Sequence, residues 1–499
     1  MHLSRLSALP LCLFGAVVLV TSCSSGTTPS GNDGGADSGG PAQLTPSSAC
    51  SDTIDSVYAD PGTLPADKGA IIKCATDKAI AKADLQTQAN ADGYKGKAFT
   101  SGAKVYRVLY RTERGDAKNT AGYSSAIVYV PDTPRADGLP VVVASHGSRG
   151  QAARCAPSKQ DPSTDTNTDF RRQVFPLVGL GYAVIAPDLA GYANWGAANN
   201  PPPVYASTAD VGKSTLDGAR ALKKLFPALS DKTVIVGHSQ GGHTALSALA
   251  LASTYGTSGT VVGVATYAPL WLSQRSWGAV AFASIGKNYP INTNVPAGVA
   301  LWYLYTHAEM LDGPGEGKKL FVQGAQAPVE AFVKNKCWGE APYPYKDFDA
   351  VGTVASDLFD QGFGGSVGLA AAITGNCNGD ATCDKWMARF AEDRPHLTGA
   401  AQKTPLLMVY GLADDTIPPN RITCAIDRLK TDGANMTVCG VPGEGHGSVL
   451  GAKVDYVSDW IASLTLGAAA PAKCEKDETA IVDPMTMMPA TCASPPPND

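Results

Sequence analysis

Several residue types and motifs are scarce in this chain of 499 residues, and each scarcity excludes a class of function. Charged residues make up only 17% of the chain and the net charge is −5, so no basic surface for nucleic acid is expected. The 7 histidines are scattered, and neither an H-E-x-x-H motif nor a paired C-x-x-C occurs. We therefore predict no nucleic-acid partner and no metal site.

Glycine-rich nucleotide-binding motifs are also missing where they would be needed. Neither a Walker motif nor a dinucleotide-binding pattern follows the first strand of the predicted core. Gly179-Leu180-Gly181 lies before a strand rather than after one, so it cannot serve that role. We therefore predict no cofactor.

The N-terminal apolar run, residues 9–20, is too short to cross a membrane as a helix. His2 and Arg5 precede it, which is typical of a signal peptide, here predicted over residues 1–22. Val20-Thr21-Ser22-Cys23 resembles a bacterial lipobox, by which Cys23 would become the acylated first residue of a lipoprotein. The alternatives are an ordinary secretory signal, or a disulfide made by Cys23. We expect a lipoprotein anchored to the membrane of the bacterial cell envelope, at the outer membrane or surface, or else a secreted protein.

Both ends of the mature chain are too polar or too simple in composition to form a core. Residues 23–48 are mostly Gly, Ser, Pro, Thr and Asp and predict a flexible linker behind the lipid anchor, and residues 467–499 are a Pro- and Ala-rich tail. Cysteine, in contrast, is plentiful, and the 12 cysteines indicate disulfides and an oxidising compartment. When Cys12 and Cys23 are set aside, ten of the 12 cysteines remain, an even number as disulfide pairing requires.

Strand and helix patterns alternate through most of the chain. Strands are predicted at residues 104–110, 124–130, 140–145, 182–186, 233–236, 261–267, 405–410 and 436–441. Helices are predicted at residues 67–86, 174–180, 208–226, 421–431 and 448–464. We expect an antiparallel start followed by a mainly parallel sheet with helices on both faces, an α/β fold.

The alternation stops between residues 269 and 403. This segment has helical pieces, glycine-rich breaks and five of the seven tryptophans: Trp271, Trp277, Trp302, Trp338 and Trp386. We interpret residues 269–403 as a helical cap, inserted into a core that residues 49–268 and 404–466 form together.

Residues 233–249 read TVIVGHSQGGHTALSAL and predict a strand, a sharp turn and a helix in succession. The turn matches the G-x-S-x-G nucleophile elbow, with Ser239 at its apex. Gly237 and Gly241 lack the side chains that a strained turn would exclude, and the N-terminus of the helix favours a developing oxyanion. The alternative is a glycine-rich turn with an incidental serine. The flanking strand and helix favour Ser239 as a nucleophile.

A serine nucleophile needs a base, and the base needs an orienting carboxylate. In the fold class with this elbow, they follow in the order Ser, Asp or Glu, then His, on loops after late strands. Asp414 fits the pattern G-x-x-D-x-x-[IV]-P, which its neighbour Asp415 does not, and His446 lies between glycines after the next strand. We predict the triad Ser239, Asp414 and His446. The alternative for Asp414 is a loop residue that caps a helix.

The other histidines of the mature chain are interpreted as structural. His238 and His243 lie too close to Ser239 in sequence to bridge it to a distant acid. His146 precedes the loop after the strand 140–145. His307 and His396 fall in the cap.

An oxyanion hole needs two backbone N–H donors. The N–H of Gln240, directly after the nucleophile, is predicted to be one. Ser148, in the loop after the strand 140–145, is predicted to supply the other, because Gly147 lets the chain approach closely. A plain tight turn is the alternative for this loop.

Taken together, these motifs resemble the secretory lipases of the lipase A type, in the α/β-hydrolase superfamily. The likeness rests on Ser145-His-Gly-Ser-Arg-Gly150, Cys155-Ala-Pro-Ser158, Gly181-Tyr-Ala-Val-Ile-Ala-Pro-Asp188, Leu216-Asp-Gly-Ala-Arg220, Gly237-His-Ser-Gln-Gly-Gly-His243 and Asp414-x-x-Ile-Pro418. It covers residues 50–465, and the elbow has the bacterial form. It implies an α/β-hydrolase with a helical cap that hydrolyses lipid or other carboxylic esters. Ser239, Asp414 and His446 match the triad positions of that family.

The resemblance also implies roles for the cap and the cysteines. The tryptophans of the cap would line an acyl pocket, or would only pack the cap's own core. A bond between Cys155 and Cys337 would tie the cap to the core. Pairing of sequence neighbours suggests Cys50–Cys74, Cys377–Cys383, Cys424–Cys439 and Cys474–Cys492, although sequence cannot fix connectivity.

Two rival functions share these features. A serine peptidase of the prolyl type has the same triad order, although no N-terminal domain the size of a propeller is present. A non-catalytic surface lipoprotein could keep the fold for binding, but a complete triad argues against it.

Overall fold

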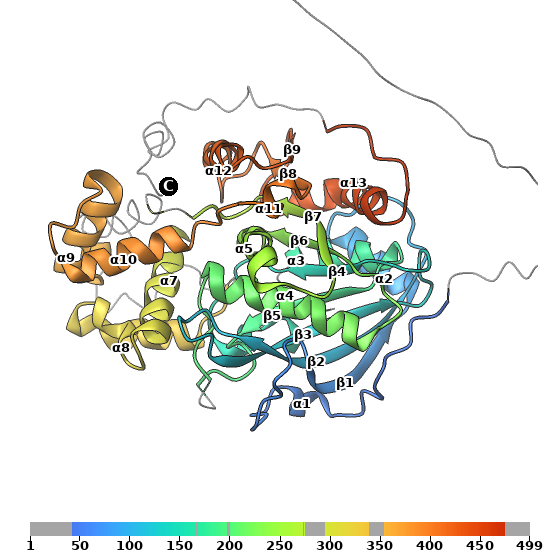
Figure 1. Ribbon diagram of the computed structural model, residues 1–499, viewed down its shortest axis with the longest axis horizontal. Helices are drawn as coiled ribbons and strands as arrows, with labels where there is room; N and C mark the ends of the chain where they lie inside the picture. Colours follow the sequence, from blue (N-terminus) through green and yellow to red (C-terminus); the bar gives the residue numbers. More distant parts are fainter. Residues whose placement is uncertain are drawn as a thin grey trace, which may run out of the picture. The chain divides into compact units, whose positions relative to one another are not determined.

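In the computed structural model, residues 42–162, 164, 168–196, 200–272, 274, 295–338 and 354–474 are described. Within them, nine strands form one sheet in the order β1-β2-β3-β5-β4-β6-β7-β8-β9 (Figure 1). The strands are β1 (Ile71–Ile80), β2 (Ala103–Glu113), β3 (Ala121–Pro131), β4 (Val141–Ser145), β5 (Val184–Ala190), β6 (Lys232–His238), β7 (Thr260–Tyr267), β8 (Leu406–Gly411) and β9 (Met436–Val441). Pairing is antiparallel from β1 to β5 and parallel across the rest of the sheet.

The parallel strands are apolar on both faces because helices cover both sides of the sheet. Every residue of β4 is buried, and β6 is buried after its first residue. Helices α4 (Thr208–Leu225) and α5 (Gln240–Tyr255) pack together on one face. On the other face α3 (Thr168–Gly179) packs between α2 (Lys82–Ala91) and α13 (Ser448–Thr465) (Figure 1). The predicted α/β architecture is confirmed.

The helix predicted at residues 67–86 is wrong. Residues Ile71–Ile80 form β1, and a helix begins only at Lys82. β1 pairs with β2 along most of its length, and a disulfide joins Cys74 to Cys50. β-Branched residues such as Ile72 suit this extended backbone, but the partner strand lies far along the chain. A local pattern does not show such a long-range pairing.

The segment predicted as the cap has its own hydrophobic cluster, separate from the main core. Its helices are α7 (Val295–Leu311), α8 (Gln326–Asn335), α9 (Gln361–Phe363) and α10 (Ala381–Glu392), with π-helical turns η7 (Gly364–Gly368) and η8 (Ala370–Thr374). Trp302 and Trp386 are fully buried in this cluster, so they pack the cap's own core. Trp271 packs in the main core, and Trp277 lies outside the described residues.

The main core extends slightly beyond the expected boundary at residue 404. Leu397 and Ala401, from the segment leading into α11 (Ala400–Lys403), already belong to the main cluster. The remaining core helices are α1 (Ile54–Val57) and α12 (Pro419–Thr431). Packing against the sheet therefore resumes before β8 begins.

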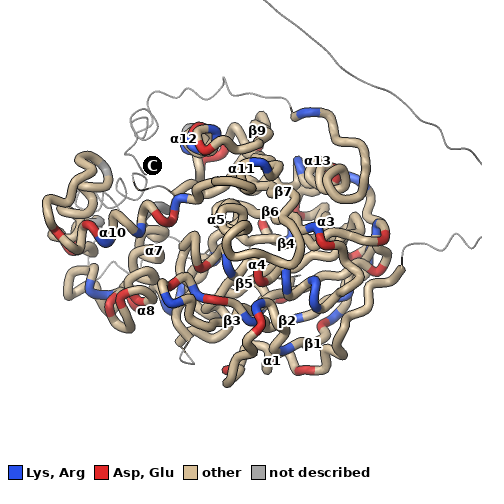
Figure 2. Tube along the Cα trace, viewed as in Figure 1, with Lys and Arg blue, Asp and Glu red and all other residues tan. Residues whose placement is uncertain are grey.

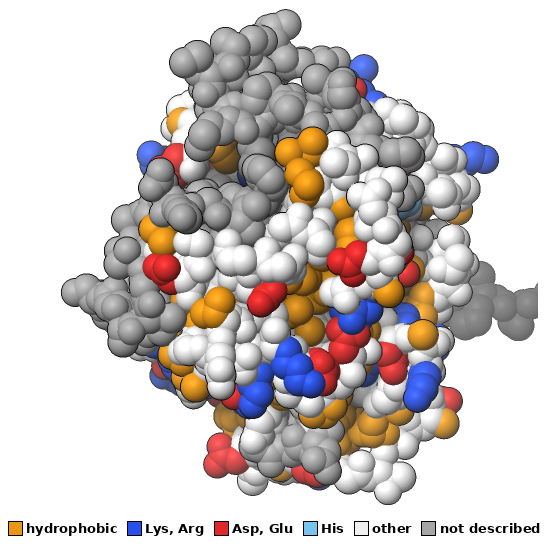
Figure 3. All heavy atoms as spheres, turned by 90° about the vertical axis from the view of Figure 1, so that its left-hand side faces the viewer, with side chains coloured by type: hydrophobic (Ala, Val, Ile, Leu, Met, Phe, Trp, Pro, Cys, Tyr) orange, Lys and Arg blue, Asp and Glu red, His pale blue; other side chains and the backbone are white. Residues whose placement is uncertain are grey.

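Much of the exposed apolar surface comes from the cap. Of the exposed large hydrophobic side chains in the described part, Leu311, Leu369 and Ile373 belong to the cap. Figure 3 shows hydrophobic side chains interspersed with charged ones on one face of the molecule. Figure 2 likewise shows acidic and basic residues intermixed along the chain, as expected for a slightly negative protein.

Four disulfides join described cysteines. Three of them are pairs that the sequence suggested: Cys50–Cys74, Cys155–Cys337 and Cys377–Cys383. The fourth joins Cys439 to Cys474, so the predicted pairs Cys424–Cys439 and Cys474–Cys492 are wrong. Cys439 on β9 meets the chain where it returns after α13, a proximity created by the fold rather than by sequence spacing. Cys424 is also disulfide-bonded, and Cys23 and Cys492 lie outside the described residues.

None of the helices in the described ranges combines the length and the apolar character needed to span a bilayer. Nor do His, Cys, Asp and Glu side chains gather there in a group of three or more that could hold a metal ion.

Candidate active site

Ser239 occupies a strained turn between β6 and α5. Its backbone has φ 55° and ψ −120°, which a residue with a side chain rarely adopts and which costs about 1–3 kcal/mol. A Cβ atom at Gly237 would collide with the carbonyl of Gly241, and one at Gly241 would collide with the carbonyl of Ser145. Only glycine therefore fits on both sides of the serine, as the elbow motif predicts.

The elbow is fixed to the end of β7. The Ser239 amide donates to the Tyr267 carbonyl at 2.9 Å, and the Leu270 amide donates to the Ser239 carbonyl at 2.8 Å. The strained conformation is held by these bonds on both sides of the nucleophile. Such bracing is what keeps a strained residue from relaxing.

Asp414, rather than Asp415, contacts His446. The His446 Nδ1 lies 2.8 Å from Asp414 Oδ2, while Asp414 Oδ1 accepts from the amides of Thr416 and Ile417, each at 2.9 Å. Asp414 is buried, whereas Asp415 is exposed. An N–H at Nδ1 leaves the lone pair on Nε2, which is the tautomer that a general base needs.

Burial lowers the pKa of His446 below its usual 6.5, and the hydrogen bond to Asp414 opposes that shift. The ring is therefore neutral at pH 7 and able to accept a proton. It lies close to the elbow: the rings of His446 and His238, the residue before Ser239, are 4.6 Å apart between centroids.

A hydrogen bond between the Ser239 hydroxyl and the His446 ring, which a working triad needs, is not among the hydrogen bonds of the described residues. Such bonds are often long before a substrate is bound. The triad as a catalytic unit therefore stays a prediction, supported by the Asp414–His446 contact and by the elbow.

The loop after β4 carries the second predicted oxyanion donor. The Ser148 hydroxyl lies 2.6 Å from the hydroxyl of Tyr205, which also packs in the hydrophobic cluster of the cap. The amide of Gln240 is at the first position of α5, where N–H groups have no acceptor within the helix. The N–H groups of Gln240 and Ser148 remain the predicted donors.

This oxyanion loop is also bonded to the cap. The Trp338 amide donates to the Arg149 carbonyl at 2.8 Å, and Arg154 donates to the Asn335 carbonyl. The Cys155–Cys337 disulfide lies between these contacts. The loop that would hold the oxyanion is therefore fixed to residues 335–338, in the middle of the predicted cap.

The other histidines have structural partners. The ring of His146 contacts the carbonyls of Gly147 and Asp188, and the ring of His243 contacts the carbonyl of Ala206. Burial lowers the pKa of His243 to about 4. His307 bonds Asp393 at 2.7 Å, and His396 contacts Arg394. None of these four contacts Asp414.

Asp169 and Arg149 also lie at this site, although no sequence motif predicts them, and so does His238, which the sequence predicts to be structural. Arg149 is buried and lies 3.1 Å from Asp169 Oδ1, and Asp169 Oδ2 accepts from the Gly147 amide at 3.1 Å. Asp169 lies in a polar stretch that matches no catalytic motif, so no local signal could have identified it.

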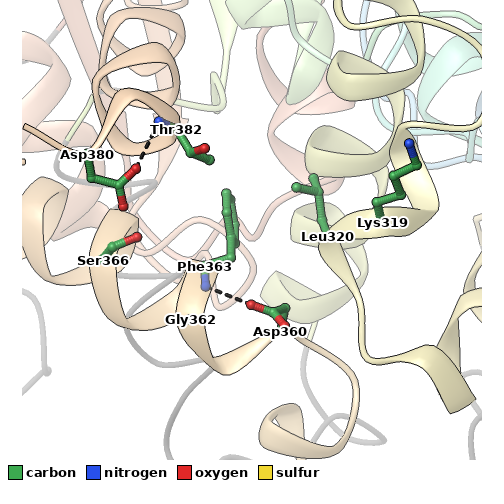
Figure 4. Close-up of a pocket in the computed structure, with 8 residues that line it drawn as sticks. All are labelled: Lys319, Leu320, Asp360, Gly362, Phe363, Ser366, Asp380 and Thr382. Atoms are coloured by element: carbon green, nitrogen blue, oxygen red, sulfur yellow. Dashed lines mark hydrogen bonds between the residues drawn. The ribbon is translucent and has the colours of Figure 1, made fainter.

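Two hollows lie away from these residues. One, of about 370 Å³, is in the cap between η3 (Gly317–Leu320), α9 and the start of α10 (Figure 4). Its carboxylates cap helices: Asp360 accepts from the Phe363 amide and Asp380 from the Thr382 amide, each at 2.9 Å. The other, of about 490 Å³, lies between β1, α2 and η2 (Pro157–Lys159). Neither contains a predicted catalytic residue.

Residues 141–457 match the sequence profile of the alpha/beta hydrolase family. The chain therefore belongs to this family.

Solved structures share the fold at low sequence identity. Lipase A of Candida antarctica in its closed state is 18% identical, with a TM-score of 0.57 over 84% of this chain and 88% of that one. A putative hydrolase from Legionella pneumophila is 15% identical, with a TM-score of 0.58 over 79% and 98%. The rice cell wall degrading esterase LipA from Xanthomonas oryzae is 18% identical in its ligand-bound form, with a TM-score of 0.56 over 80% and 99%.

A curated relative matches over a shorter stretch. The 2-hydroxy-6-oxononadienedioate/2-hydroxy-6-oxononatrienedioate hydrolase 1 of Dechloromonas aromatica is 36% identical over 117 residues. That match covers 23% of this chain and 32% of the relative, so the chain matches about a third of the relative's length.

Proposed function

We propose that this protein is a serine carboxylic-ester hydrolase of the lipase or esterase type, acting on small-molecule or lipid esters, with a role in lipid catabolism. The Asp414–His446 bond of 2.8 Å carries this proposal, because it sets the base in the correct tautomer. The strained Ser239 at the N-terminus of α5 supports it. Two similar structures bear the names lipase and esterase, which is consistent with this class.

In the proposed mechanism, Ser239 Oγ attacks the ester carbonyl carbon while His446 Nε2 takes the hydroxyl proton. The Asp414 carboxylate stabilises the imidazolium, and the amides of Gln240 and Ser148 stabilise the negative oxygen. As the tetrahedral intermediate collapses, the bond to the alcohol oxygen breaks and His446 returns the proton to that oxygen. Water, deprotonated by His446, then attacks the acyl-enzyme and releases the acid and the free serine.

Removal of the nucleophile tests the proposal. The Ser239→Ala variant and the wild-type protein are compared on p-nitrophenyl esters from butyrate to palmitate, with and without emulsion. We expect kcat to fall by at least about 10³-fold in the variant, because the acyl-enzyme cannot form. Equal background rates for both proteins would contradict the enzyme assignment. Cleavage of aminoacyl-proline amides in preference to esters would favour a peptidase.

We further propose that Cys23 is lipid-modified and that residues 23–48 link this anchor to the catalytic domain. The signal at residues 1–22 and the abundance of cysteine support export to an oxidising compartment. The observed disulfides fit this location. In this arrangement, the catalytic core comprises residues 49–268 and 404–466 and the cap comprises residues 269–403.

A further inference from the structure

A single partly buried carboxylate, that of Asp169, lies at the junction of the two loops that the proposed mechanism uses. Its Oδ1 pairs with the Arg149 guanidinium at 3.1 Å. Its Oδ2 accepts from the Gly147 amide at 3.1 Å and faces His238 Nδ1 at 3.4 Å. Gly147 and Arg149 flank Ser148, the predicted oxyanion donor, so Asp169 holds the oxyanion loop on both sides of that residue.

His238 continues the contact to the base. Its Nε2 lies 2.9 Å from the backbone carbonyl oxygen of His446. Two chains of contacts therefore end at His446. One runs from Asp169 through His238 to the backbone carbonyl of His446, and the other runs from Asp414 to its ring. Asp414 fixes the ring of the base, and His238 fixes its backbone.

Both partners of His238 can only accept hydrogen bonds. A carboxylate oxygen faces one ring nitrogen and a backbone carbonyl faces the other. A neutral imidazole has one N–H, so both bonds are made together only by the imidazolium. Burial alone would raise the pKa of Asp169, but the Arg149 guanidinium and the His238 ring hold it far below its usual range. Asp169 is thus ionised and can accept a hydrogen bond from the His238 ring.

The packing leaves little freedom at this junction. A Cβ atom added at Gly147 would come within 2.8 Å of Asp169 Oδ2, 3.3 Å of His238 Nδ1 and 3.4 Å of Ser239 Cβ. The oxyanion loop, the Asp169–His238 pair and the nucleophile are therefore in mutual contact. A displacement of the pair would therefore be transmitted to both the loop and the nucleophile.

We propose that Asp169 and His238 are positioning residues, which hold the oxyanion loop and the backbone of the base His446 in register around Ser239. This inference rests on the proposed ester hydrolysis. Neither residue contacts the reacting atoms in this scheme. A purely structural ion pair between Arg149 and Asp169 would not require the bond from His238 to the carbonyl of the base itself.

His238 has a second effect, through its electrostatic influence on His446. The two rings lie 4.6 Å apart between centroids, and His238 contributes to lowering the pKa of His446. The other titratable and charged groups near this pair come from three elements: Asp414 after β8, Asp169 and Arg172 on α3, and His146 and Arg149 after β4. Loss of the imidazole at position 238 should therefore raise the pKa of His446. The acid limb of kcat/KM should then move to higher pH, because the base must be neutral to act.

Two substitutions at position 238 separate the hydrogen bond from the electrostatic effect of the imidazole. In His238→Gln, the side-chain amide can still donate to the His446 carbonyl, but the imidazole is lost. His238→Phe removes both. On p-nitrophenyl butyrate we expect kcat to fall about 10- to 100-fold in His238→Phe, and less in His238→Gln, with KM little changed. The acid limb should move to higher pH in both variants.

Asp169→Asn completes the set, and His396→Gln is the matched control for a histidine outside the site. Asp169→Asn should lower kcat by a similar factor to His238→Phe, and the control should match the wild type. Melting temperatures are measured for all variants, since a merely structural role would lower stability without separating His238→Gln from His238→Phe in kcat.

The outcomes distinguish this inference from the proposed function. If the wild type hydrolyses the ester and Ser239→Ala does not, the function stands. Unchanged kcat and pH limbs in folded His238→Phe and Asp169→Asn would then overturn the positioning role alone. If the wild type and Ser239→Ala are equally inactive while both are folded, the proposed function fails first.

Discussion

Asp414 has little orientational freedom, since both of its oxygens are engaged by groups that can only donate in this arrangement. Two backbone amides bind one oxygen, and the His446 ring binds the other. Asp415, one residue further on, is exposed and makes no contact with the ring. The difference between the two neighbours follows from the sharp turn after β8, which directs one carboxylate inward and the other outward.

This contrast gives a matched pair of variants. Asp414→Asn should lower kcat on p-nitrophenyl esters by about 10⁴-fold, because the amide can donate to His446 Nδ1 and stabilise the wrong tautomer. Asp415→Asn should remain within about twofold of the wild type, since a surface carboxylate contributes little. Steady-state rates of the two variants make the comparison. Equal losses in both, or a greater loss at position 415, would identify a different acid.

Among the elements, the loops after β4 and β9 carry predicted site residues, Ser148 and His446, and each is held by long-range contacts. The loop after β4 is joined to the cap by the Cys155–Cys337 bond, across a sequence separation of 182 residues. The Cys377–Cys383 bond lies wholly within the cap and closes a separation of only 6 residues. Closing a longer loop removes more entropy from the unfolded chain.

The two bonds should therefore differ when they are removed. Replacing Cys155 and Cys337 by Ala should destabilise the protein by roughly 2–5 kcal/mol and also lower kcat, because the oxyanion loop loses its attachment. The same replacement at Cys377 and Cys383 should cost less stability, about 2 kcal/mol, and leave kcat nearly unchanged. Urea unfolding and esterase assays measure both effects. If the short-loop variant proved the less stable and less active one, the loop would not depend on the cap.

Local sequence predicted those elements whose structure is decided locally. β4, β6 and β7 are short apolar runs buried on both faces, and the elbow motif carries its own turn chemistry. The strand β1 was mistaken for a helix because its pairing with β2 is not visible in its own residues. The Cys439–Cys474 bond and the contacts of Asp169 were missed for the same reason, since each joins segments that only the folded sheet brings together.

At the scale of the whole molecule, the described residues, from 42 to 474, belong to one compact unit. Within it the cap and the core are joined by polar bonds as well as by a disulfide. The Tyr205 amide donates to Thr306 Oγ1 at 3.1 Å, and the Thr208 amide donates to Asp393 Oδ1 at 2.8 Å. Catalysis should therefore depend on this unit and not on the segment that precedes it.

The proposed anchor can be tested without disturbing that unit. Cys23→Ser should move the protein from the membrane fraction to the soluble fraction of the expressing bacterium. In the proposed anchor, the acyl chains that hold the protein to the membrane are attached at Cys23 alone. Its kcat on a soluble ester should equal that of the wild type. Cys12→Ser, in the predicted signal peptide, is the control and should leave the distribution unchanged. Retention of Cys23→Ser in the membrane would contradict lipid attachment at this residue.

The disulfide and hydrogen bonds between the oxyanion loop and residues 335–338 matter for any attempt to transfer substrate preference from one relative to another. A chimaera that replaces the inserted segment would also replace Cys337, and so leave the thiol of Cys155 without its counterpart. If the predicted cap meets the acyl chain, selectivity and turnover should be linked, because the same segment is bonded to the loop that would hold the oxyanion. Chimaeras that keep residues 335–338 of this protein should change substrate preference with the smallest loss of kcat.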